Sequence, residues 1–251
     1  MWWMKSLVVC SGQLFSPCYH ISEAAVTAVQ QMMQQSFEQW GLPQRIRVDN
    51  GKPFGDPQRC SVPELALWLI GLGVEVVWNR PRTPKDNAKV ERMQATTSRW
   101  TEAEQCYSDS ELQSKLDRAA AVQREHYKSR RLGLKSRKEL FTELWHNSRS
   151  YSKDTFDLSR VGYYLSRTTF MRKVNKRGVF NFYAQRVYVG YSHLSKVLCL
   201  RYEAEKKYFV LTDESNTAIG YIQADNFSQE NILHLNVCQN RYIKCQNFVS
   251  L

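Results

Sequence analysis

The order of elements between residues 45 and 104 constrains the fold of this chain most strongly, because strand-like and helix-like patterns alternate there. Two short runs rich in Val and Ile, residues 45–48 and 74–78, predict strands. Between them, the capping-box pattern Ser61-x-x-Glu64 predicts a short helix to about residue 72, and residues 87–104 predict another helix after a proline-containing loop. This alternation indicates an α/β layer architecture.

The flanking segments extend the same architecture. Residues 2–19 predict a β-hairpin with a turn at Ser11 and Gly12, and apolar residues at three- and four-residue spacing predict a helix over residues 22–39. Two further capping boxes, Ser108-x-x-Glu111 and Ser136-x-x-Glu139, predict helices over residues 109–128 and 137–145.

The pattern changes near Tyr151, where we place a domain boundary. Short alternating runs separated by turns follow, and six such strands within about 60 residues favour a small closed β-barrel. The predicted strands cover residues 169–174, 179–182, 186–189, 197–202, 208–211 and 219–222.

The charge balance favours a polyanionic partner. The chain has 35 Lys and Arg against 24 Asp and Glu, a formal net charge of +11. The bases cluster in residues 78–100 and 124–138, and neither cluster has the amphipathic pattern of a membrane-surface helix. No apolar run approaches the roughly 20 residues of a membrane span, so we expect a cytoplasmic protein that binds nucleic acid and no membrane. Seven scattered cysteines without a CxxC pair argue against both a disulfide framework and a zinc site.

Two acidic residues occupy positions where a metal site could form. Asp49 ends the first of the two strands, and Glu91 lies near the start of the helix after the basic loop. If that helix packs beside the strand, the two carboxylates face each other, and a hard cation such as Mg²⁺ or Mn²⁺ would relieve their repulsion. Such ions on a basic surface suggest phosphodiester chemistry. Alternatively, Asp49 caps a turn and Glu91 pairs with Lys89 or Arg92 on the surface.

The local sequence resembles a known family at this point. "GLPQRIRVDNGKPFG" followed by "PRTPKDNAKVERM" is similar to the integrase core of DDE transposases and retroviral-type integrases, whose pattern is G-x-P-x-x-I-x-x-D-N-G and then P-x-x-P-x-x-N-x-x-x-E-R. The resemblance implies an RNase H-like core with Asp49 and Glu91 as the second and third acids of a metal-binding triad. It also implies Mg²⁺ or Mn²⁺ as cofactor, no small-molecule cofactor, and DNA as partner. Asn50, Gly51 and Asn87 would support the acids.

The resemblance extends further along the chain. "HYKSRRLGLKSRKELF" is similar to the family's post-catalytic segment, and residues 170–203 look like the SH3-like barrel that many such transposases carry. The expected domains are therefore an RNase H-like core (residues 1–106), a helical segment (107–150), an SH3-like barrel (151–224) and a C-terminal tail (225–251). The residues expected to contact DNA phosphates are the bases of the core loop and helix and those of one barrel strand and turn: Arg80, Arg82, Lys85, Lys89, Arg92, Arg172, Lys173, Lys176 and Arg177.

The first acid of the triad has no counterpart here, since no aspartate precedes Asp49. In the family this acid lies on a strand in the middle of the sheet, between the strands matched by residues 2–9 and 45–48. We therefore expect an RNase H-like core without its first strand. Such a chain folds poorly, pairs residues 7–9 directly with residues 46–48, or takes a strand from another chain.

The resemblance thus implies a DNA transposition or integration protein whose intact relatives perform two-metal strand transfer. We expect this chain to be a fragment or inactive copy that does not cut DNA by itself. The alternative is a non-catalytic remnant that binds DNA or oligomerises, with itself or with an intact transposase. In a bacterium it would associate with the nucleoid.

Overall fold

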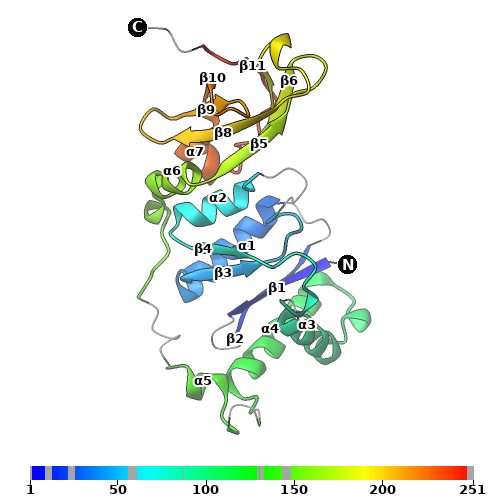
Figure 1. Cartoon of the computed structure of the whole chain (residues 1–251). Helices are drawn as coiled ribbons and strands as arrows, with labels where there is room; N and C mark the ends of the chain where they lie inside the picture. Colours follow the sequence, from blue (N-terminus) through cyan, green and yellow to red (C-terminus); the bar gives the residue numbers. More distant parts are fainter. Residues whose placement is uncertain are drawn as a thin grey trace. The chain divides into compact units, whose positions relative to one another are not determined.

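The structure is a computed structural model that describes residues 2–8, 13–21, 26–55, 61–86, 88–128, 130, 133–142 and 148–247 (Figure 1). These residues form a mixed α/β protein with two compact units. The first unit combines Met1–Asp49 with Val76–Lys153, and the second combines Asn50–Glu75 with Asp154–Leu251. The chain therefore leaves the first unit after Asp49, returns to it, and leaves it again after Lys153, which is close to the predicted boundary at Tyr151. The expected division into four segments stays a prediction.

The first unit begins with the predicted β-hairpin, which is confirmed. Strands β1 (Trp2–Val8) and β2 (Gln13–Ile21) pair in antiparallel register, from Trp2 opposite Ile21 to Val8 opposite Gln13. The predicted turn residues 9–12 lie outside the described residues. Helix α1 (Val26–Trp40) follows, and it buries Val29, Met33 and Phe37, which recur at the helical spacing seen in the sequence.

The strands β3 (Arg45–Val48) and β4 (Glu75–Trp78) form a sheet of their own. The N–H of Asn79 donates to the carbonyl of Val48 at 2.9 Å, which joins residues at the carboxyl ends of both strands, so the two strands run parallel. Among the described strand residues, β1 pairs with β2 alone and β3 pairs with β4 alone. The direct pairing of residues 7–9 with residues 46–48 is therefore absent at the positions that the structure describes.

Three helices complete the first unit: α3 (Ala88–Thr101), α4 (Asp109–Glu125) and α5 (Arg137–Leu140). Two short 3₁₀ helices, η1 (Pro84–Asp86) and η2 (Ala103–Gln105), precede and follow α3. The capping box predicted at Ser136 is confirmed. At Ser108 the hydroxyl caps the helix by accepting from the N–H of Glu111, but the Glu111 side chain accepts from the N–H of Tyr107. Helix α5 ends at Leu140 rather than near residue 145. Helix α4 packs along β2, and a buried bond from Gln123 Nε2 to Thr97 Oγ1, 3.1 Å long, ties it to α3.

The second unit is centred on helix α2 (Glu64–Gly71), in which residues 65–71 are all buried. Helices α6 (Leu158–Ser166) and α7 (Gln229–Leu233) pack against it. The ring of Phe156 lies so close to Gly71 that a Cβ there would meet a ring carbon at 2.1 Å. The short helices η5 (Lys153–Thr155), η6 (Tyr191–His193) and η7 (Asp225–Phe227) join the remaining elements.

The capping box predicted at the start of α2 is wrong. The N-cap residue is Pro63, which has no side-chain hydrogen bond to the helix. Ser61 Oγ instead accepts from Arg172 Nη2 at 2.9 Å, and Glu64 Oε1 accepts from the N–H of Cys238 at 2.8 Å. Both side chains of the predicted box therefore bind residues more than 100 positions later, which a local pattern does not report.

The strands of the second unit form two open sheets rather than the closed barrel predicted from the sequence. One has the order β10-β9-β8-β5 and the other β11-β7-β6, and an isolated bridge between Tyr221 and Gln246 links them on one side. On the other side β5 and β6 do not pair, and Arg172 Nε donates to the carbonyl of Asn181 at 3.1 Å. The strands are β5 (Thr169–Lys173), β6 (Val179–Phe182), β7 (Gln185–Tyr188), β8 (Val197–Glu203), β9 (Tyr208–Thr212), β10 (Ala218–Gln223) and β11 (Tyr242–Lys244).

Aromatic rings fill the space between these sheets. Phe182 lies edge-on to Phe170 and to Phe209, with centroids 5.3 and 4.9 Å apart. The residues expected to form a C-terminal tail contain α7 and β11, which belong to this unit. None of the helices in the described part of the chain combines the length and apolar character needed to cross a membrane.

Candidate functional site

Asp49 directly follows β3, and its side chain is exposed. The chain then makes a tight turn in which the N–H groups of Phe54 and Gly55 both bond to the carbonyl of Gly51, at 3.1 and 2.9 Å. The turn brings Gly55 against the backbone of Asn50, where a Cβ would lie 2.5 Å from the carbonyl oxygen. Asn50 and Gly51, the predicted supporting residues, thus lie in a turn that immediately follows the acid.

The loop that leaves β4 is fixed by an ion pair between Arg80 and Asp86. Arg80 Nη2 lies 2.8 Å from Asp86 Oδ1, while Arg80 Nε and its backbone N–H bond to Oδ2 at 3.2 and 3.1 Å. These bonds lower the pKa of Asp86 to about 2, and the charge of Arg47 on β3 adds a smaller lowering. This ion pair with its two added hydrogen bonds, which we call the Arg80–Asp86 fork, therefore holds the loop closed next to β3, the strand that Asp49 follows.

Glu91 lies in the first turn of α3, with its side chain exposed. Helix α3 begins two residues after Asp86, so the Arg80–Asp86 fork also fixes where this helix starts. Asp49 follows the carboxyl end of β3, and α3 follows the loop from the carboxyl end of β4. Because the two strands are parallel, Asp49 and the loop that leads to α3 both leave the sheet at the carboxyl ends of its strands, the edge at which open α/β sheets usually bind ligands.

The chemistry of this acid pair suits a divalent ion. Carboxylate oxygens are hard donors, which Mg²⁺ and Mn²⁺ prefer, and Mg²⁺ commonly takes one or two carboxylates and completes its shell with water or phosphate. Within the described residues, no group of three or more His, Cys, Asp or Glu side chains gathers in a metal-binding arrangement. Asp49 and Glu91 are both carboxylates, so each offers the kind of ligand that a divalent ion takes.

The bases predicted around these acids are used in different ways. Arg80 is committed to Asp86, although much of its side chain remains exposed. The side chains of Arg82, Lys85 and Arg92 are exposed in the loop and on α3. Lys89 lies in the first turn of α3, and the predicted supporting residue Asn87 lies outside the described residues.

The second basic cluster, residues 124–138, is partly structural. The Arg124 guanidinium lies 5.1 Å from the ring centroid of Trp40, and its side chain is only 12% exposed, so burial lowers its pKa. Arg137 Nη1 donates to the carbonyl of Gln123 at 2.8 Å. These two arginines hold the end of α4, whereas Lys128, Arg130 and Lys135 are exposed.

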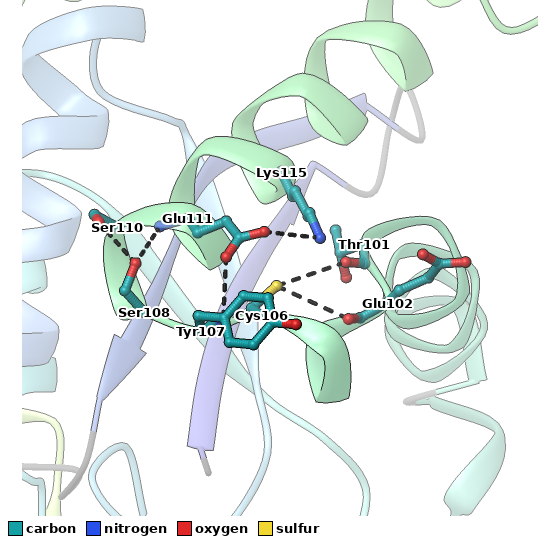
Figure 2. Close-up of polar contacts among 8 residues, drawn as sticks. All are labelled: Thr101, Glu102, Cys106, Tyr107, Ser108, Ser110, Glu111 and Lys115. Carbon is teal, nitrogen blue, oxygen red and sulfur yellow. Dashed lines mark hydrogen bonds and ion pairs between the residues drawn. The ribbon is translucent and has the colours of Figure 1, made fainter.

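The connection from α3 to α4 is held by local polar contacts (Figure 2). The thiol of Cys106 lies 3.9 and 3.8 Å from two carbonyls at the end of α3, and the Ser108 hydroxyl caps α4. Glu111 accepts a bond from the N–H of Tyr107 at 3.0 Å and pairs with Lys115 at 3.2 Å. Helix α3, which carries Glu91, is therefore anchored at its far end as well.

In the second unit, the predicted bases lie at the turn between β5 and β6. The side chain of Asn175 shapes this turn by accepting bonds from the N–H groups of Arg177 and Val179, at 2.8 and 3.2 Å. Lys173, Lys176 and Arg177 are exposed around it. Such a fixed turn can present three charges to a phosphate backbone.

Arg172 has a role that the sequence did not suggest. Its guanidinium bonds to Ser61 and to the carbonyl of Asn181, and it lies 5.1 Å from the ring centroid of Phe182. These contacts join the segment before α2 to the two sheets, so Arg172 contributes to the packing of the second unit in addition to its charge.

A scan against models of known protein families finds no match for this sequence. The function proposed for the chain therefore rests on its motifs and on the geometry of the described residues.

Proposed function

We propose that this chain is a DNA-binding protein of the DDE transposase and retroviral-type integrase class. The division of strands in the first unit carries the proposal. In that family, the strand with the first acid lies between the strands matched here by β1 and β3. Among the residues that the structure describes, the pairs are β1–β2 and β3–β4, and β1 does not pair with β3, which supports an RNase H-like sheet without this strand.

In this proposal, Asp49 and Glu91 are two ligands of a Mg²⁺ or Mn²⁺ ion at the phosphodiester. Bound there, such an ion activates the attacking oxygen and stabilises the leaving one. The Arg80–Asp86 fork orients the start of α3, and the exposed bases Arg82 and Lys85 contact the DNA backbone. Since no aspartate precedes Asp49, this chain offers two of the three triad acids, and we expect it to bind DNA without cutting it.

The second unit corresponds in this proposal to the SH3-like module that follows the core in many of these proteins. Six short strands between Thr169 and Gln223 favour the assignment. The bridge between Tyr221 and Gln246 takes the place of full pairing along one side, and the C-terminal residues supply it.

The salt dependence of duplex DNA binding tests the proposal. Neutralising Z phosphates gives a log–log slope of about −0.9Z, so replacing Lys173, Lys176 and Arg177 together by Gln reduces the slope by up to about 2.7. The control removes three charges at Lys153, Lys206 and Lys207, each within two residues of an acid in the sequence, and leaves the slope nearly unchanged. No binding at low salt, or a slope near zero, overturns DNA as the partner.

A nicking assay tests the expected lack of catalysis. The purified chain, incubated with supercoiled plasmid and Mn²⁺, leaves the plasmid intact because one triad acid is absent. Nicking that disappears in Asp49→Asn would show that the site is complete within this chain and would contradict the assignment of the acids.

A further inference from the structure

The sheet β11-β7-β6 presents a regular outer face. Its pairing register aligns side chains across the three strands, because residues directly opposite each other point to the same side of a sheet. The neighbouring residues Phe180, Phe182, Gln185 and Val187 are buried, so the alternate positions face outward. These positions form two rows across the sheet, Asn181–Arg186–Tyr242 and Val179–Tyr188–Lys244.

Tyrosine rings stand on this outer face. Tyr242 is 56% exposed. Tyr188 is half-buried, and the ring of Tyr191, which is 67% exposed, packs edge-on against it with centroids 6.1 Å apart. Tyr188 and Tyr242 occupy diagonal positions on adjacent strands, which places their Cα atoms about 7–8 Å apart. The face therefore offers separate aromatic surfaces rather than one apolar patch.

The three strands of this sheet carry no acidic residue. Residues 158–202 contain nine Lys and Arg and no Asp or Glu, and residues 231–251 also contain no acid. Both segments contribute strands to the sheet, and Arg186 and Lys244 stand in its rows, one in each. A second copy of this chain would present the same positive face, so like-charge repulsion disfavours self-association through it.

We propose that this outer face, defined by Arg186, Tyr188, Tyr191, Tyr242 and Lys244, binds an unpaired strand of DNA. The tyrosines stack on exposed bases, while Arg186 and Lys244 neutralise the phosphates, a combination that single-strand-binding surfaces use. The proposal rests on the proposed function in taking DNA as the partner. It adds that the second unit recognises unpaired nucleotides, whose base faces an intact duplex keeps stacked.

Fluorescence anisotropy with two labelled probes of equal length, an oligo-dT strand and a duplex, tests the proposal on the full chain. Base–aromatic stacking contributes about 1–3 kcal/mol per base, so Tyr242→Ala and Tyr191→Ala each weaken oligo-dT binding by roughly 5- to 150-fold. Duplex binding changes much less. Tyr242→Phe keeps the ring and retains the affinity, which separates stacking from any effect on folding.

Tyr163→Ala is the matched control, since Tyr163 is 63% exposed on α6 rather than on a strand of this sheet, and it leaves oligo-dT binding unchanged. If the chain binds duplex DNA but oligo-dT affinity is unaffected in both Tyr242→Ala and Tyr191→Ala, the single-strand site is refuted and the proposed function stands. If the chain binds neither probe at low salt, both proposals fail.

Discussion

Tyr183 joins the turn between β6 and β7 to the segment that leads into α2. Its backbone has a φ of 47°, a left-handed conformation that a bulky side chain adopts only when its surroundings hold it there. The side chain is buried, and its hydroxyl accepts a bond from the N–H of Val62 at 3.1 Å and donates to the carbonyl of Val62 at 2.8 Å. One hydroxyl therefore satisfies both backbone groups of a buried residue.

Replacing Tyr183 by Phe keeps the ring and removes this hydroxyl. The N–H and the carbonyl of Val62 then lose their partner, and each buried unsatisfied group costs about 1–3 kcal/mol. We expect the free energy of unfolding of the second unit to fall by about 2–6 kcal/mol, the sum for the two groups. That is a large share of the roughly 5–15 kcal/mol that stabilises a typical domain.

Urea unfolding at constant m-value measures this loss. Tyr163→Phe is the control, because Tyr163 is exposed and its hydroxyl accepts a bond from the likewise exposed Arg167 at 2.7 Å, so the change stays within about 0.5 kcal/mol. A loss below about 0.5 kcal/mol for Tyr183→Phe would refute the role of its hydroxyl.

Burial also raises the pKa of Tyr183 above its usual 10.0. Above pH 10 the Tyr183 hydroxyl therefore loses its proton more readily in the unfolded chain than in the folded one, and the free energy of unfolding of the wild type falls as the pH rises. Tyr183→Phe lacks this hydroxyl and so lacks this part of the pH dependence.

Two further predictions concern contacts that the sequence does not display. Arg80→Gln raises the pKa of Asp86 from about 2 toward 3.8, which NMR titration of the carboxyl measures. In the wild type this group contributes stability above pH 3.8 and loses it as the pH falls through about 2, and the variant lacks this contribution. An unchanged pKa of Asp86 would contradict the ion pair with Arg80. Gly220→Ala places a Cβ 2.4 Å from the carbonyl oxygen of Gln246, so we expect faster hydrogen exchange at the amides of Tyr221 and Gln246. In the control Gly162→Ala the new Cβ has no contact closer than 3.6 Å, and exchange at these amides stays unchanged. Equal exchange rates in the wild type and Gly220→Ala would contradict the close approach of Gly220 to Gln246.

Elements set by neighbouring residues were predictable from the sequence. The caps at Ser108 and Ser136 are local patterns, and both are present in the structure. The strands β5 to β10 begin and end within about a residue of their predicted limits, because alternating apolar residues and turn residues define them locally. We did not predict helix α6 from the sequence, although Asp157 caps it and its residues Val161 and Leu165, four positions apart, are buried.

Contacts between distant residues were not predictable. Ser61 matches a capping box, but the Arg172 guanidinium competes for its hydroxyl from 111 residues away. Strand β11 is short, and its parallel pairing with β7 exists only once the C-terminal segment has folded back. Their place among other basic residues suggested DNA contacts for Arg80 and Arg172. It gave no sign that Asp86 and Ser61 bind their guanidinium groups, because composition does not reveal partners.

We propose that Asp49 and Glu91 bind one divalent ion together, and a Mn²⁺ titration followed by electron paramagnetic resonance tests this most directly. We predict one Mn²⁺ per chain that is lost in Asp49→Asn and equally in Glu91→Gln, with the double variant no weaker than either single one, because the two carboxylates share the ion. Glu38→Gln, at an exposed acid on α1, leaves the binding unchanged. A Mn²⁺ affinity that is the same in wild type, Asp49→Asn and Glu91→Gln would contradict the claim.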